Sequence, residues 1–198
     1  MTKGSASARM TKSSSIRVRC WWDSRTDYDL YALVVYTDGR VKTVATFPAE
    51  GVPAQLATAD GAVKHLGDVG RQAIGVAEEI IEIALDDSIR AVIPVAYSAQ
   101  SNGNGSFFEY RVSMELDNGL GDRVVVTAEN ANDNSRIYTC VPGMLENTPD
   151  GVSVHALEHY SKPKSEDRPL VSLVRRGLMK KTEVVAIEMD AGPRNAYK

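Results

Sequence analysis

The stretch LYALVVYTDGRVKTVATF, from Leu30 to Phe47, decides the fold class. Leu30–Thr37 is a mostly apolar strand-like run, and Arg40–Phe47 is a second strand-like run. Asp38 and Gly39 lie between the two runs. An Asp-Gly pair in this position is a strong hairpin signal, because a type I′ turn needs positive φ at both of its central residues. The stretch therefore predicts two antiparallel strands joined by a tight turn.

The same kind of pattern continues along the chain. Apolar and polar residues alternate with a period of two in Ile16–Trp22. Asp-Gly or Asn-Gly pairs, which favour turns, recur at residues 60–61, 118–119 and 150–151. Short strands with regular turn signals are typical of an antiparallel sandwich or barrel. The predicted fold class is all-β, an antiparallel β-sandwich with short helical turns at most. The other predicted strands are Ile89–Ser98, Ser106–Leu116, Arg123–Glu129, Ser135–Val141, Val152–Tyr160 and Thr182–Met189.

One segment, Glu78–Asp87, fits two structures. As an amphipathic helix it would place Ile80, Ile83 and Ala84 on one face. As a strand it would place Ile81, Ile83 and Leu85 inward. Its three isoleucines favour the strand, because β-branched residues are enriched in strands.

Length and composition narrow the class of protein. A chain of 198 residues with 43% hydrophobic residues is enough for one domain with a packed core. The net charge of −3 argues against bulk nucleic-acid binding. No stretch approaches the roughly 20 apolar residues of a membrane helix, and the polar N-terminus has no apolar core of a secretory signal. We therefore expect a cytoplasmic protein with no transmembrane segment.

The predicted organisation is one domain with two tails. Residues 1–15 are polar and are expected to be a disordered tail, within which Met10 is an alternative start. Residues 16–190 are expected to form a single sandwich domain, to which residues 162–190 add a basic C-terminal hairpin. Residues 191–198 are expected to be a C-terminal tail.

The two cysteines, Cys20 and Cys140, lie in apolar strand-like runs. Two distant cysteines in a chain without a signal sequence are expected to be buried free thiols. A disulfide is the lesser alternative, and no neighbour in the sequence would activate either thiol as a nucleophile.

Acidic residues mark two irregular segments. Val63–Glu79 starts as an alternating strand and then loses its periodicity, with carboxylates at Asp68 and at its far end. An irregular segment of this length is usually functional or disordered. Asp27 and Asp29 are two residues apart where a loop enters a strand, so their side chains would project to the same side. Taken alone, such a pair is also compatible with a solvated turn.

Several motifs, in their order and spacing, resemble the TerD (tellurium-resistance) family. The resemblance covers roughly Ile16 to Ser161. The matching pieces are Trp22-Asp23, DYDLYA at Asp27–Ala32, Asp38-Gly39, ADGAVKHLGD at Ala59–Asp68, FFEYRVSMELDNG at Phe107–Gly119 and VPGMLENTPDGVSVHALEHY at Val141–Tyr160.

The resemblance implies a β-sandwich that binds calcium between two acidic loops. The chain departs from the family pattern at Val69 and Ala77, and its usual Gly- and acid-rich stretch reads GRQAIGV. Ca²⁺ accepts six to eight oxygen ligands in irregular geometry, so carbonyls and water can fill such gaps. The alternative is a solvated, metal-free loop. Carried over by position, the metal ligands would be Asp27, Asp29, Asp68, Glu78 and Glu79.

A basic segment lies beyond the best part of this resemblance. Lys162–Lys181 contains seven basic and two acidic residues in an otherwise acidic protein. It is compatible with a solvated strand pair whose turn is RRGLMKK, Arg175–Lys181. It is also compatible with a docking patch for an acidic partner or an anionic surface, which leaves peripheral membrane contact open. The patch would consist of Arg175, Arg176, Lys180 and Lys181.

Two functions follow from these observations. The leading hypothesis is a non-enzymatic calcium-binding module of a bacterial tellurite or general stress resistance system, working with protein partners of a stress-resistance complex. The alternative is an interaction module of the same fold that has lost its metal site and acts through its basic hairpin. No nucleophile–base set is visible. His155 and His159 lie in a predicted strand, where this spacing separates them by roughly 13 Å, too far for one metal ion.

Overall fold

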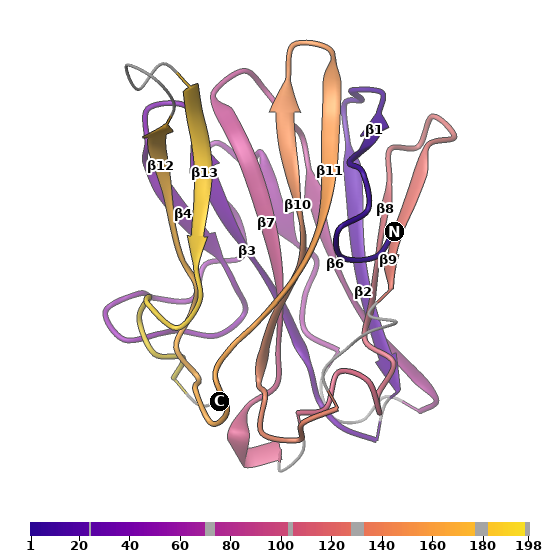
Figure 1. Ribbon diagram of the computed structural model, residues 1–198, viewed down its shortest axis with the longest axis vertical. Helices are drawn as coiled ribbons and strands as arrows, with labels where there is room; N and C mark the ends of the chain where they lie inside the picture. The colour runs from indigo at the N-terminus through magenta and orange to yellow at the C-terminus, as the bar shows by residue number, and fades with distance from the viewer. Residues whose placement is uncertain (24, 70–73, 103–104, 128–132, 177–181, 197–198) are drawn as a thin grey trace.

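Strands make up nearly all the regular structure in a computed structural model of the protein (Figure 1). The structure describes residues 1–23, 25–69, 74–102, 105–127, 133–176 and 182–196. In these ranges the chain forms thirteen strands and one 3-10 helix, which confirms the predicted all-β class. The elements are β1 (Ala8–Met10), β2 (Ile16–Asp23), β3 (Asp29–Tyr36), β4 (Val41–Val44), β5 (Val63–His65), β6 (Val76–Ile83), β7 (Ile89–Tyr97), η1 (Gln100–Asn102), β8 (Ser113–Asp117), β9 (Arg123–Thr127), β10 (Thr139–Thr148), β11 (Gly151–Tyr160), β12 (Leu170–Arg176) and β13 (Thr182–Glu188).

Two antiparallel sheets form the sandwich. One has six strands in the order β1-β11-β10-β7-β3-β4, and the other has five in the order β5-β6-β2-β8-β9. Their inward-facing side chains form one apolar cluster. In β2 this face consists of alternate residues, Ile16, Val18, Cys20 and Trp22, each at most 1% exposed. The period of two that the sequence shows is therefore the period of burial, and the predicted β-sandwich is confirmed.

A tight turn joins β3 and β4, as predicted, but it is not of type I′, because only Gly39 of the Asp38-Gly39 pair has a positive φ. Gly39 has a φ of +88°, and Tyr36 N–H donates to Arg40 O across the turn. The segment that fitted both helix and strand is the strand β6, with Ile81 and Ile83 buried as the strand alternative required. Both cysteines are buried free thiols, as predicted.

The outer face of the six-stranded sheet is covered as well. The strands β12 and β13 pair with each other as a separate hairpin (Figure 1). The hairpin residue Val171 belongs to a second apolar cluster with Tyr31, Leu33 and Val35, which are the outward-facing residues of β3. Every residue of β3 is consequently buried. The predicted C-terminal hairpin is thus a third layer over part of the sandwich.

The N-terminal residues differ from the disorder expected for residues 1–15. The strand β1 pairs with β11, and the side chain of Met10 is buried. Met1 bonds to β9 of the other sheet: its amino group donates to Val125 O (2.5 Å), and its carbonyl accepts from Thr127 N–H (3.4 Å). The N-terminal segment therefore joins the open edges of both sheets.

Two further expectations are corrected. The predicted strand Ser106–Leu116 is a strand only from Ser113, because the preceding residues turn and Arg111 has a φ of +53°. Its apolar residues contribute to an aromatic cluster instead: the rings of Tyr28 and Phe107 pack in a tilted arrangement, with centroids 5.1 Å apart. The expected C-terminal tail is anchored up to residue 196, since Asn195 is buried and bridges to Ala49.

Candidate metal centre

Three carboxylates converge at one end of the sandwich. Asp29, Asp68 and Glu79 each offer an oxygen atom, and these atoms lie within 4.8 Å of one another. Asp29 and Glu79 are buried, whereas Asp68 is exposed. The group could hold a metal ion, since buried carboxylates at this separation repel one another unless a cation lies between them.

Each sheet supplies one of the buried acids. Asp29 is the first residue of β3 in the six-stranded sheet, and Glu79 takes an inward-facing position of β6 in the five-stranded sheet. Leu30 N–H donates to Glu79 Oε2 (2.6 Å), which fixes the two acids relative to each other across the core. The carboxylates therefore meet where the two layers of the sandwich face each other.

His65 connects the third acid to this pair. Its Nε2 lies 2.8 Å from Leu30 O and 3.3 Å from Glu79 Oε2, and its Nδ1 accepts from Gly67 N–H (3.0 Å). The Gly67 bond anchors the start of the loop that carries Asp68. Sequence reasoning gave His65 no role, and the only sign of one was its inward position two residues after Val63 in the alternation of β5.

The hydrogen bonds also assign the roles of the two ring nitrogens of His65. Because Nδ1 accepts the Gly67 amide proton, it holds a lone pair, and the ring proton resides on Nε2. From there it is donated toward Leu30 O and Glu79 Oε2. In this arrangement the imidazole contributes a hydrogen bond to the acidic cluster through Nε2.

Glu79 is the least satisfied member of the cluster. The residue is 1% exposed, and its Oε1 atom has no hydrogen-bond partner among the described residues. Burial raises the pKa of Glu79, the bonds from His65 and Leu30 oppose that shift, and the charge of Asp68 adds to it. A buried carboxylate oxygen without a donor costs free energy, so this atom fits a cation.

The structure separates Glu78 from this group, which corrects the expected set of five ligands. Consecutive residues of a strand project to opposite faces, and Glu79 faces inward. Glu78 therefore faces outward, where it forms an ion pair with Arg19 of β2, whose Nε lies 2.5 Å from Glu78 Oε2.

Asp27 is close in sequence but is not among the three converging acids. It is 8% exposed, and its main-chain oxygen accepts from Ser98 Oγ and Asn102 Nδ2, both at 2.9 Å. It lies before β3, where the period of two that predicted a shared side with Asp29 does not apply. Through this main-chain oxygen it fastens the loop that leads to Asp29.

The predicted basic patch is only partly within the described residues. Arg175 lies on the exposed hairpin, where its Nε is 2.9 Å from Glu183 Oε1. Lys180 and Lys181 lie outside the described residues, as does the side chain of Arg176. Arg168, from the same basic segment, is buried and contributes nothing to a surface.

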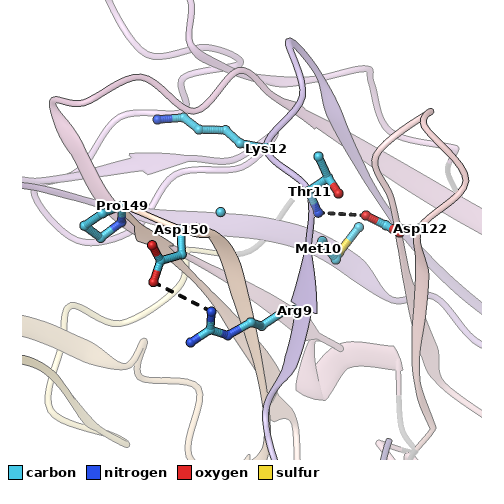
Figure 2. Close-up of a pocket in the computed structure, with 8 residues that line it drawn as sticks. Arg9, Met10, Thr11, Lys12, Asp122, Pro149 and Asp150 are labelled. Carbon is cyan, nitrogen blue, oxygen red and sulfur yellow. Dashed lines mark hydrogen bonds and ion pairs between the residues drawn. The ribbon is translucent and has the colours of Figure 1, made fainter.

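A polar cleft of about 400 Å³ lies at the opposite end of the sandwich (Figure 2). It is bounded by β1, the turn after β8 and the turn after β10. Arg9 and Asp150 form an ion pair across it (3.7 Å), and Thr11 N–H donates to Asp122 Oδ2 (2.7 Å). Both partners of the ion pair are largely exposed, so the cleft holds no buried charge comparable with Glu79.

The fold defines a class, a TerD-like β-sandwich. The chain is similar to the crystal structure of a homologue of the telluride resistance protein TerD, SCO6318 from Streptomyces coelicolor A3(2), with a TM-score of 0.53 and 16% identity over 74% of this chain and 89% of that one. It is also similar to the crystal structure of SAV2460, a protein of unknown function, with a TM-score of 0.54 and 13% identity over 78% of this chain and 92% of that one. At these identities the likeness is one of fold, and it confirms the TerD-like fold that the motifs implied.

Sequence comparisons add no closer assignment. No protein-family model and no curated protein matches the chain. In the described part of the structure, no helix is long and apolar enough to cross a membrane.

Proposed function

We propose that the protein is a non-enzymatic calcium-binding module that acts in a cytoplasmic response to tellurite or general stress. The observation that carries the proposal is the bare Oε1 atom of Glu79, buried beside the carboxylates of Asp29 and Asp68. The link to stress is supported by the fold likeness to a homologue of a telluride resistance protein.

The donor set favours calcium among the common metal ions. All three side chains offer oxygen, and the nitrogen atoms of His65 are engaged in hydrogen bonds. Thiolate and imidazole ligands, which zinc prefers, are therefore not offered. Ca²⁺ accepts carboxylates, main-chain carbonyls and water at irregular angles, whereas Mg²⁺ demands a compact octahedron and retains its water.

The role we propose for the ion is to fasten the sandwich at one end. Asp29 and Glu79 belong to different sheets, and Asp68 belongs to the loop between β5 and β6. A bound cation would neutralise their mutual repulsion and join three segments. The buried thiols of Cys20 and Cys140 support the non-enzymatic part of the proposal, because burial raises the pKa of both and keeps them unreactive.

The test is the thermal and calorimetric response of the full chain to calcium. A ligand that binds only the folded state stabilises it by RT ln(1 + [L]/Kd), so a site with a Kd of ~10⁻⁵ M contributes roughly 2.7 kcal/mol at 1 mM Ca²⁺. We expect the melting temperature to rise by several degrees relative to chelator, and to rise less with Mg²⁺.

Neighbouring glutamates provide a matched control. Glu79→Gln should abolish the calcium response, while Glu78→Gln should leave it unchanged, because only Glu79 faces the cluster. Equal melting temperatures of the wild type in chelator and in calcium would reject the proposal. The interaction module that acts through its basic hairpin would then be the better account.

A further inference from the structure

Exposed apolar side chains gather around the candidate metal centre. Eight large apolar residues are exposed in the described part of the chain, and four of them lie in the loop between β5 and β6 or at its end, on either side of Asp68. Ile74 is 98% exposed, which is rare for an isoleucine in a folded domain. These four residues are Leu66, Val69, Ile74 and Val76.

Two more exposed residues lie beside this loop. Leu56 neighbours its start, because the Leu56 carbonyl accepts from His65 N–H (2.8 Å). Phe108 lies near its end, in the segment whose Tyr110 carbonyl accepts from Asp23 N–H (2.9 Å), and Asp23 stands opposite Val76 in the β2–β6 pair. We call the six residues the apolar rim: Leu56, Leu66, Val69, Ile74, Val76 and Phe108.

We propose that the apolar rim docks on a membrane surface of anionic phospholipids, and that the cation held by Asp29, Asp68 and Glu79 bridges the protein to the lipid phosphates. This inference rests on the proposed calcium binding. It names a lipid surface as the target of the same site. Binding to that surface would require the cation.

The coordination of the ion leaves room for such a bridge. Three carboxylates offer at most six oxygens, and Glu79 Oε2 already accepts from Leu30 N–H. Ca²⁺ takes six to eight ligands, so positions remain beyond these carboxylates that oxygens from outside the protein can fill. Asp68 is exposed, which leaves the cluster accessible from that side, and phosphodiester oxygens are suitable hard ligands.

The surrounding side chains distinguish a membrane from a soluble phosphate. A soluble anion gains nothing from exposed leucine, valine and isoleucine, whereas a bilayer offers acyl chains to receive them. Without a cation the three acids would be repelled by an anionic leaflet. With it, the ion attracts the headgroups while the rim enters the interface.

The experiment measures sedimentation of the full chain with vesicles. The vesicles contain phosphatidylcholine alone or phosphatidylcholine with phosphatidylserine, each in chelator and in 1 mM Ca²⁺. We expect binding only to the phosphatidylserine vesicles and only with calcium. Binding that is equal in chelator, or equal on phosphatidylcholine alone, would overturn the inference.

Variants then locate the binding surface. Val69→Ser combined with Ile74→Ser should weaken vesicle binding at least tenfold and leave the calcium-induced rise in melting temperature intact. Leu120→Ser is the matched control, because Leu120 is 64% exposed in the turn between β8 and β9, outside the rim. Equal losses in both variants would overturn the location.

The two proposals can fail separately. A calcium-induced rise in melting temperature without vesicle binding would refute the lipid inference while calcium binding stands, and the rim would then fit a protein partner. No calcium response at all would refute both.

Discussion

Arg168 and Glu79 are both buried charged residues, and each leaves one atom without a hydrogen-bond partner among the described residues, Nη1 in Arg168 and Oε1 in Glu79. Arg168 Nε donates to Asn195 Oδ1 (2.5 Å), its Nη2 donates to Phe47 O (3.1 Å), and its guanidinium lies over the ring of Tyr31, 4.9 Å from the centroid. Glu79 accepts bonds at one oxygen and leaves the other bare. The difference lies in their neighbours: two hydrogen bonds and aromatic rings hold Arg168, whereas Glu79 lies beside two further carboxylates, whose mutual repulsion a cation would relieve.

Replacing Arg168 should destabilise the protein strongly. Arg168→Ala removes two hydrogen bonds and two cation–π contacts, leaves buried acceptors without donors, and opens a cavity beneath the hairpin. We expect the free energy of unfolding to fall by about 2–4 kcal/mol, measured by urea denaturation.

Arg40→Ala is the control for that variant. Arg40 also lies over an aromatic ring, that of Tyr36 (5.0 Å), and pairs with Asp38, but it is largely exposed. An exposed pair contributes little to stability, so the loss should be much smaller than that of Arg168→Ala. Similar losses in the two variants would show that burial is not what gives Arg168 its importance.

The raised pKa of Glu79 makes a signed prediction about pH. Below its ordinary value of 4.5 the carboxyl is protonated in both the folded and the unfolded state and affects stability little. As pH rises from 4.5 toward the higher pKa of the folded state, the unfolded state loses this proton while the folded state keeps it. The unfolded state therefore gains stability relative to the folded state over this range. In chelator, Glu79→Gln should therefore be more stable than the wild type at pH 7, and the difference should vanish near pH 4.

Denaturant titrations of both proteins across this pH range measure the effect. Calcium should reduce the difference in stability between Glu79→Gln and the wild type at pH 7, because the ion stabilises the ionised carboxylate, which only the wild type has. A variant less stable than the wild type in chelator at pH 7 would mean that the bonds from His65 and Leu30 outweigh burial.

At the scale of elements, the edges of the two sheets explain the ordered N-terminus. The strand β1 covers the outer edge of β11, and Met1 bonds to the outer edge of β9. Unpaired strand edges are sites of association between chains, and covering them suppresses it. Residues 1–15 thus protect the sandwich despite their polar composition.

Two truncations separate the contribution of β1 from that of the residues before it. Removal of residues 1–7 keeps β1, whereas removal of residues 1–10 exposes the edge of β11. We expect the longer truncation to lower the melting temperature further and to cause concentration-dependent self-association in gel filtration. Identical behaviour of the two truncations would show that β1 protects nothing.

The fold was largely predictable because burial in a sandwich repeats every two residues. Ile16, Val18, Cys20 and Trp22 show the pattern directly, and the Asp-Gly pair fixed one hairpin. The strand β1 was missed because main-chain hydrogen bonds hold it at the sheet edge. The polar side chains of the segment give no sign of these main-chain bonds. The strand predicted from Ser106 began late because an aromatic run packed into a turn imitates one.

The candidate site was only partly predictable. The family resemblance pointed to Asp29, Asp68 and Glu79, but it carried Glu78 along with them. Strand alternation alone separates Glu78 from Glu79, since adjacent residues of β6 cannot face the same side. The role of His65 depends on contacts between β3, β5 and β6, which no local pattern encodes.

At the scale of the whole molecule, the protein is a sandwich with a third layer on one side. The hairpin β12–β13 covers apolar residues of β3 that would otherwise face solvent (Figure 1). The candidate metal centre joins the two inner layers, so the three layers are fastened at different places. Loss of one fastening should therefore leave the others in place.

Adjacent residues of β12 test the docking of the third layer. Val171 is 5% exposed and packs on the six-stranded sheet, whereas Ser172 is exposed on the other face. We expect Val171→Asp to cost about 2–4 kcal/mol of stability and to increase binding of a hydrophobic dye, and Ser172→Asp to change stability by less than about 0.5 kcal/mol. If Val171→Asp left the stability and the dye binding unchanged, packing of the hairpin on the sheet would not contribute to the stability of the protein.

The two buried thiols can report how often the sandwich opens. Cys20 lies in the five-stranded sheet and Cys140 in the six-stranded sheet, and both are shut away from solvent. A thiol reagent can modify them only in molecules whose layers have parted, so the labelling rate counts openings of the sandwich. A cation that fastens the layers would slow that rate, and a variant that loosens them would quicken it, without any change to the sequence to introduce a reporter.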